Sequence, residues 1–295
     1  MSQLTFSLAG IPFALHGEGD TPLRLPETYG PFLRPCADLA PAAEFRLLDS
    51  GAQLDEPAPG DTVVWDCPTW RMVRTANRDL AIQIRVVPDE HLLTVAVARS
   101  DFSSARLIPR AGRKGAASPY ALNYPCDQAL IINRLSYFNA GLVHCCGVAW
   151  DDSALLFSGP SGVGKTTLGR LWRNAGASLL NDDRMLIRWI NREVFASASP
   201  WHGEERAIIA DILPLGAVFF LRQGLENRIE PAGAAESLGL LMANTVAPFY
   251  LPEAVERIAA TWSAVLETVP AFHFTFTPDA RAVETCQAHV ARLGA

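Results

Sequence analysis

The feature that most constrains the fold is the run Gly159-Pro160-Ser161-Gly162-Val163-Gly164-Lys165-Thr166, which has the spacing G-x-x-x-x-G-K-[ST]. The apolar run Ala154–Ser158 precedes it, and a helical pattern from Thr167 to Ala175 follows it. A glycine-rich turn between a strand and a helix lets successive backbone N–H groups face phosphate oxygens, and the helix adds the positive end of its dipole. The chain is therefore predicted to bind a nucleotide through a P-loop.

The side chains of this motif have distinct expected roles. Lys165 supplies a compact charge to the outer phosphates, Thr166 supplies the hydroxyl that holds Mg²⁺, and Thr167 completes the nucleotide-binding set. The chain uses arginine for nearly all its cations, and Lys114 and Lys165 are its only lysines. A lysine thus stands where the motif requires one. ATP and Mg²⁺ are the expected cofactors.

A second element, Asn181-Asp182-Asp183, follows the apolar pair Leu179-Leu180, with Asp182 17 residues after Lys165. One helix and one strand fit in that interval, so the two carboxylates are predicted at the carboxyl end of the strand beside the P-loop strand. A surface Asx turn is the alternative. We assign Asp182 as the base that accepts the proton of an attacking hydroxyl and Asp183 as support for Mg²⁺. Since alternate residues of an extended segment face opposite ways, the reverse assignment stays open.

His144 is the third candidate, 21 residues before Lys165 and near the start of the strand-like run Leu142–Trp150. A lone histidine is more often a core residue than a catalyst. The order of His144, the P-loop and Asp182-Asp183, however, resembles the catalytic domain of HPr kinase/phosphorylase, in which a histidine precedes the P-loop and a paired acid follows it. The resemblance covers residues 140–190 by motif and 121–295 by layout.

This resemblance implies a P-loop kinase domain of the type shared with phosphoenolpyruvate carboxykinase, with His144 in the catalytic set and Asp182 as the base. The sequence departs from the family at Lys165-Thr166-Thr167, where the family usually has Lys-Ser-Glu, and it lacks the downstream Glu-x-Arg-Gly-Leu-Gly signature. Reverse, phosphorylase activity is therefore not expected. The chain is more similar to HPr-kinase-related proteins found with peptide-modification genes, including kinases that phosphorylate lasso-peptide precursors.

The resemblance accordingly implies an ATP- and Mg²⁺-dependent kinase that phosphorylates a Ser or Thr hydroxyl of a peptide or small protein, such as a ribosomal peptide precursor. A small-molecule kinase and a nucleotide-dependent binding module without phosphotransfer are the alternatives. A transporter-type ATPase is disfavoured, because the strand-like run Ala217–Leu221 ends in Arg222 rather than the usual Asp and no Leu-Ser-Gly-Gly-Gln signature is present.

The segment Pro200–Arg206 concentrates Trp, His, two Glu and an Arg around one Gly where the family signature would stand. It is interpreted either as a loop that orders the substrate or supplies a second carboxylate to Mg²⁺, or as a loop that caps a helix starting near Ala207.

The fold class predicted is α/β, with the kinase domain at residues 121–295 preceded by a β-rich, mostly antiparallel domain of unknown role at residues 1–120. Short β-type runs between Pro and Gly residues indicate the first domain. The polar segment Ile108–Pro119 is the expected boundary, either a solvated loop or an arm for an acidic substrate. In the second domain, helical patterns alternate with strand-like runs; the helices are expected at 127–139, 167–175, 234–243, 252–268 and from 279 onward.

Composition excludes several classes of protein. With 295 residues, 49% hydrophobic and 19% charged, the chain is expected to build one large or two modest domains. Its formal net charge of -6 argues against nucleic acid as a partner. No signal peptide and no apolar run of membrane-spanning length appear, so a cytoplasmic protein without membrane contact is expected. The six cysteines lack C-x-x-C spacing and are expected to be reduced, with Cys145-Cys146 in the core. A homo-oligomer is compatible with the sequence.

Overall fold

The computed structural model describes residues 2–18, 23–35, 40–49, 58, 60–86, 91–109, 120, 122–205 and 208–293. Most of the expected boundary segment, residues 110–119, lies outside these ranges, as do Cys36, Arg206 and Ala207. The contacts within the chain define two compact units: residues 1–135 with 248–254, and residues 136–247 with 255–295. Each unit has its own large sheet, and the chain is of mixed α/β class.

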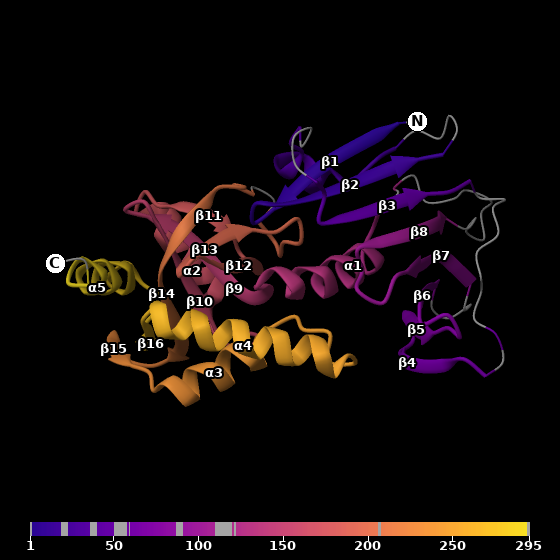
Figure 1. Cartoon of the computed structure of the whole chain (residues 1–295). Helices are drawn as coiled ribbons and strands as arrows, with labels where there is room; N and C mark the ends of the chain where they lie inside the picture. The colour runs from indigo at the N-terminus through magenta and orange to yellow at the C-terminus, as the bar shows by residue number, and fades with distance from the viewer. Residues whose placement is uncertain are drawn as a thin grey trace. The chain divides into compact units, whose positions relative to one another are not determined.

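The first unit contains an eight-stranded sheet in the order β1-β2-β3-β8-β7-β6-β5-β4 (Figure 1). Among the described pairings in this sheet, five of seven are antiparallel; β2–β3 and β3–β8 are parallel. The β-rich character expected for the N-terminal part is confirmed. The elements of this unit are β1 (Gln3–Leu8), β2 (Ile11–Gly17), η1 (Glu27–Phe32), β3 (Ala43–Leu47), β4 (Thr62–Asp66), β5 (Trp70–Arg74), β6 (Leu80–Val86), β7 (His91–Ala98), β8 (Ser104–Pro109) and α1 (Cys126–Leu135).

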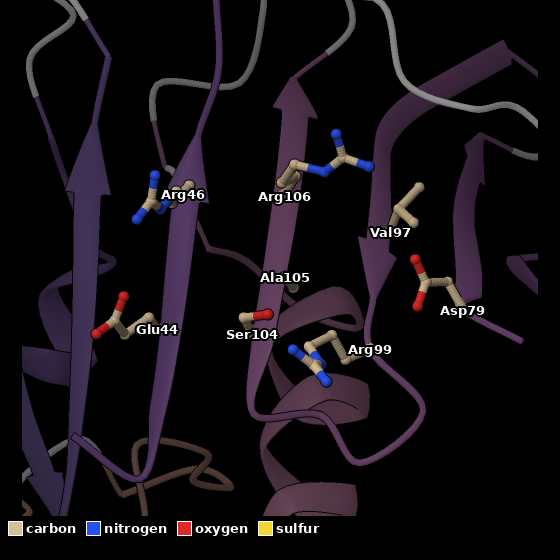
Figure 2. Close-up of a pocket in the computed structure, with 8 residues that line it drawn as sticks. All are labelled: Glu44, Arg46, Asp79, Val97, Arg99, Ser104, Ala105 and Arg106. Carbon is tan, nitrogen blue, oxygen red and sulfur yellow. The ribbon is translucent and has the colours of Figure 1, made fainter. Parts of the chain in front are cut away.

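Apolar side chains at alternate strand positions build the core of this sheet. Phe13, Phe45 and Leu107 are fully buried on one face, whereas intervening positions carry polar or charged side chains at Glu44, Arg46, Ser104 and Arg106 (Figure 2). Helix α1 contacts β7 and belongs to the first unit, although its pattern groups it with the second half of the chain.

In the second unit the strand path β10-β9-β12-β13-β14 closes on itself, because β10 also pairs with β14. β16 and β15 extend the sheet beyond β14, and β11 pairs with β9. The strands are β9 (Ala140–Trp150), β10 (Ser153–Ser158), β11 (Ser178–Asn181), β12 (Arg184–Ile190), β13 (Glu193–Ala198), β14 (Ile212–Gln223), β15 (Arg228–Pro231) and β16 (Ala271–Phe276).

Helices cover both faces of these strands (Figure 1). One apolar cluster joins α2 and α5 to the strands through residues such as Trp172 and Phe157, and a second joins α3 and α4 through residues such as Trp262 and Leu156. The helices are α2 (Lys165–Asn174), α3 (Ala234–Ala243), α4 (Pro252–Thr268) and α5 (Ala280–Ala291), with the short η2 (Ser136–Phe138).

Cys145 and Cys146 lie fully buried in these two different clusters, on opposite faces of β9. Burial raises the pKa of Cys145 to about 12, so its thiol stays protonated at neutral pH. Five of the cysteines are free thiols, and the expectation that the adjacent pair belongs to the core is confirmed.

Two expectations about elements are corrected. Ala207 itself lies outside the described residues, but the residues after it form no helix, because residues 208–211 are irregular and β14 begins at Ile212. β11 pairs with β9 rather than with the P-loop strand β10. Within the described residues, no helix is long and apolar enough to cross a membrane.

Candidate functional site

The glycine-rich turn lies between β10 and α2, which is the context expected for a phosphate-binding loop. Gly162 and Gly164 have φ angles of 79° and 108°, which L side chains rarely adopt. At Gly164, which caps the N-terminus of α2, an added Cβ would lie 2.8 Å from the ring of Phe276. The turn therefore needs glycine at this position both for its backbone conformation and for space.

Lys165, the first residue of α2, is 7% exposed, and its ammonium lies inside the turn. Nζ donates hydrogen bonds to the carbonyl oxygens of Gly159 and Pro160 at 2.8 and 3.1 Å. Burial lowers the pKa of Lys165, and the negative charge of Asp183 opposes that shift. Thr166 is half-buried beside it and Thr167 is exposed.

A cavity of about 400 Å³ adjoins the turn. The turn contributes one side of it, and the ends of β14 and β16 contribute the other, where Gln223 Nε2 donates to the carbonyl of Gly162 at 3.1 Å. The lining residues are Gly162, Val163, Gly164, Thr167, Gln223, Gly224, Phe276 and Pro278. The last four were not predicted, because they are distant in sequence and carry no motif of their own.

The acid pair lies at the predicted edge of the sheet, but its strand has a different neighbour from the one predicted. β10 and β11 are both antiparallel to β9, one on each side of it, so their carboxyl ends point the same way. Cys145 of β9 lies opposite Ser158, the last residue of β10, and its N–H donates to the carbonyl of Asp183 at 3.0 Å. β9 therefore lies between the P-loop strand and the acid pair and is hydrogen-bonded to both.

Asp182 is 3% exposed, and backbone amides engage both of its carboxylate oxygens. Oδ1 accepts from the N–H of Gly203 at 2.9 Å, and Oδ2 accepts from those of Glu204 at 2.9 Å and Glu205 at 3.1 Å. Asn181 adds Nδ2 bonds to the carbonyls of Ser199 and Trp201. Asp182 thus holds the segment 199–205 in place, which leaves it poorly placed to meet a substrate hydroxyl.

Asp183 lies in a different environment. Its side chain is 21% exposed; Oδ1 lies 3.1 Å from His144 Nδ1, and Oδ2 lies 3.1 Å from Arg184 Nε. The hydrogen bond from His144 lowers the pKa of Asp183 and outweighs its burial; Arg184 and Lys165 add to the lowering. The carboxylate is therefore ionised at neutral pH, accessible, and electrostatically coupled to the P-loop lysine.

His144 stands on β9 directly opposite Arg184 of β12, with its side chain 35% exposed. The structure brings Lys165, Asp183 and His144 together, whereas Asp182 faces away into the segment 199–205. Arg184 is a member of this cluster that was not predicted, because a pairing across β9 and β12 has no local sequence signal.

The segment 199–205 is also fastened to α2. Arg170 contacts Glu204 at 2.8 Å and Glu205 at 2.9 Å, and Arg173 contacts Glu205 at 2.8 Å. Both glutamates are thereby paired with arginines. This arrangement favours an ordered loop beside the P-loop helix over a source of a second carboxylate for Mg²⁺.

Comparisons with solved structures show a distant likeness, and comparisons with family models and curated proteins show none. A solved structure of the Hpr(Ser) kinase/phosphatase from Coxiella burnetii aligns with 52% of this chain and 99% of its own length, at 15% sequence identity and a TM-score of 0.32. A TM-score of this size supports no conclusion about function, so the function is argued from the geometry of the site.

Proposed function

We propose that the chain is an ATP- and Mg²⁺-dependent phosphotransferase whose acceptor is a Ser or Thr hydroxyl of a peptide or small protein. The observation that supports this most is the convergence of Lys165, Asp183 and His144 at the end of the P-loop strand. A binding module that only senses nucleotide has no need for an accessible carboxylate coupled to the P-loop lysine.

In this proposal the turn 159–164 and the N-terminus of α2 hold the phosphates of ATP through backbone N–H groups. The ammonium of Lys165, which now bonds the carbonyls of Gly159 and Pro160, turns to the outer phosphates. The adjoining cavity of about 400 Å³ takes the nucleoside, with Phe276 and Pro278 as its apolar wall.

Asp183 takes the role that the sequence assigned to Asp182. Its ionised carboxylate orients the acceptor hydroxyl and receives its proton, while His144 fixes the orientation of that carboxylate. The acceptor oxygen forms a bond to the γ-phosphorus, the bond from that phosphorus to the bridging oxygen breaks, and ADP leaves. Since phosphoryl transfer depends mainly on positioning and charge neutralisation, a weakly basic carboxylate is sufficient.

The residues present fit Mg²⁺ in chemical type. Mg²⁺ in such sites is held by one or two protein oxygens together with phosphates and water, and Thr166 Oγ1 would supply such an oxygen. Asp183, which is the proton acceptor in this proposal, would add negative charge near the ion without being its ligand. Within the described residues, no group of three or more His, Cys, Asp or Glu could hold a metal by protein ligands alone. When bound, Mg²⁺ neutralises charge on the phosphates.

Titration of the full chain with ATP, with and without Mg²⁺, tests the binding part of the proposal. Lys165→Ala is expected to weaken binding at least about tenfold, because it removes a charge from the phosphates. Lys114→Ala changes the only other lysine and is the matched control, expected to bind as the wild type does. Equal binding by the Lys165→Ala variant and the wild type would contradict the assignment of the P-loop.

Transfer is tested with γ-labelled ATP and two acceptor sets, a degenerate library of Ser- and Thr-containing peptides and a panel of small alcohols. Label on peptides that disappears in Asp183→Asn, with ATP binding retained, is the expected result. Label on small alcohols alone indicates a small-molecule kinase. A wild-type chain that binds ATP with Mg²⁺ and labels neither set would replace this proposal with a nucleotide-dependent binding module.

A further inference from the structure

Gln223 is a polar side chain in the wall of the nucleotide cavity, and it comes from the end of β14. β14 runs parallel to the P-loop strand β10, so its carboxyl end lies beside the glycine-rich turn. Gln223 Nε2 donates to the carbonyl oxygen of Gly162 at 3.1 Å. A side chain 61 residues away in sequence thus contacts the backbone of the turn, and nothing in the proposed phosphotransfer steps uses this contact.

This bond fixes the direction of one peptide group of the turn. The peptide that joins Gly162 to Val163 is trans, so its C=O and its N–H point in opposite directions. The C=O points to Gln223, and the N–H of Val163 donates to the carbonyl of Pro160 at 3.3 Å. The same carbonyl accepts from Lys165 Nζ at 3.1 Å. The N–H of Val163 and the P-loop ammonium are therefore aimed at one point inside the turn.

Gly162 does little to hold this peptide by itself. Its φ is 79°, and a Cβ added there would meet no described atom within 4 Å. Glycine adopts positive and negative φ about equally readily, so the peptide 162–163 can rotate at low cost. Rotation would turn its carbonyl inward, against phosphate oxygens, and its N–H outward. The donor from Gln223 opposes this rotation, because it bonds the carbonyl only in the outward orientation.

The strand end that carries Gln223 is itself held on both sides. Gln223 lies opposite Phe276 of β16, and the N–H of Gly224 donates to the carbonyl of Phe276 at 3.3 Å. Successive side chains of a strand point to opposite faces, and on the other face Arg222 Nη2 lies 3.3 Å from Glu236 Oε1 of α3. The amide of Gln223 therefore extends from a supported backbone.

We propose that Gln223 is a positioning residue for the phosphates of the donor, which it serves by holding the N–H of Val163 toward them. This inference rests on the proposed P-loop function and adds a residue to it. Because the N–H is already oriented in the empty turn, binding does not have to reorient it. Gln223 acts through the backbone of the turn, so its effect is the same for ATP and for an inorganic triphosphate that lacks the nucleoside.

Calorimetric titration of the full chain with ATP and, separately, with inorganic triphosphate, both with Mg²⁺, tests this role. Gln223→Met keeps the length of the side chain and removes the donor, and it is expected to weaken the binding of both ligands about fivefold, as the loss of one hydrogen bond does. Gln83→Met makes the same exchange on β6 of the first unit and is the control, expected to bind both ligands as the wild type does.

The transfer assay gives a second readout. Gln223→Met should raise KM for ATP about fivefold and leave kcat at saturating ATP unchanged, because Gln223 touches no reacting atom. The inference is overturned if Gln223→Met binds both ligands as tightly as the wild type, if it weakens ATP but not triphosphate, or if the wild type binds ATP alone. A wild-type chain that binds neither ligand overturns the proposed function as well, so the two failures are distinguishable.

Discussion

Replacing Asp182 by asparagine distinguishes a residue that holds the segment 199–205 from a catalytic base. Asparagine has the same shape, but only one of its two terminal atoms accepts hydrogen bonds. Its carbonyl can replace Oδ2 and keep the bonds from Glu204 and Glu205, and its NH₂ group then faces the N–H of Gly203. One bond is lost, and two change from charge-assisted to neutral.

The magnitude follows from these three bonds. A hydrogen bond to a charged group contributes about 1.5–3 kcal/mol, and a neutral one about half as much. Losing one and weakening two gives a local cost of about 3 kcal/mol after some relaxation of the segment. Since about 1.4 kcal/mol corresponds to a factor of ten, amides that exchange by opening of this segment are expected to exchange about 100-fold faster.

Hydrogen–deuterium exchange measured by mass spectrometry on residues 199–205 is the assay. Asp183→Asn is the matched control, because the Asp183 side chain pairs with His144 and Arg184 rather than with this segment, and its replacement should leave exchange there unchanged. Phosphate transfer, in contrast, should be reduced more by Asp183→Asn than by Asp182→Asn. Unchanged exchange in Asp182→Asn together with abolished transfer would refute this reasoning and restore Asp182 as the base.

Two further predictions concern the turn and the acid pair. Gly164→Ala and Gly176→Ala both place alanine at positive φ, which costs about 1 kcal/mol or more, but only the alanine at 164 also meets Phe276. Gly164→Ala should therefore lose more stability than Gly176→Ala in urea unfolding. Only Gly164→Ala should lose ATP binding in a titration. His144→Gln removes the bond that lowers the pKa of Asp183. The stability that comes from a lowered carboxylate pKa is present above the pKa of the unfolded state and is lost as pH falls through the pKa of the folded state. The stability that His144→Gln loses in urea unfolding should therefore be largest above about pH 5 and shrink below about pH 4. A loss of stability that does not depend on pH would contradict this.

Helices of the second unit could be predicted closely because local signals mark their ends. α3 and α4 span the residues expected from their apolar spacing, and Pro252, at the first helical position of α4, has no N–H that needs a partner. At the start of α5, the Asp279 side chain accepts from the N–H of Arg281 at 2.9 Å. Signals of this kind act over a few residues and need no knowledge of the tertiary structure.

Strands β1, β2 and β13 were not predicted, because the turns beside them lack the usual residues. β1 and β2 are joined through Ala9-Gly10, and β12 and β13 through Asn191-Arg192, with positive φ at both central residues of each turn. Turns of this type usually contain Asn-Gly or Asp-Gly, so neither pair marks a hairpin clearly. β15 is only four residues long and is defined by its pairing with β16.

The neighbours of a strand are still harder to infer, and the acid pair shows why this matters for function. The interval from Lys165 to Asp182 correctly indicates one helix and one strand, yet it cannot show that β9 lies between β10 and β11. β9 supplies His144, which bonds Asp183 and not Asp182, and the segment 199–205 supplies the amides that engage Asp182. Both partners come from other parts of the chain, so motif spacing locates the pair without assigning its roles.

The two aspartates are also coupled through the side chain of Asn181, which limits how far a substitution can change one of their roles alone. Asn181 Oδ1 accepts from the N–H groups of Asp183 and Arg184 at 2.9 and 3.0 Å, while Asn181 Nδ2 bonds the same segment that Asp182 holds. Loosening that segment therefore disturbs the backbone that carries Asp183, and Asp182→Asn should reduce transfer as well as protection from exchange. The two effects differ in their response to ligand: if Asp182 only holds the segment, saturating ATP and Mg²⁺ that bind the folded site should restore part of the lost transfer. Asp183→Asn should gain nothing from saturation, because the group that receives the proton is absent.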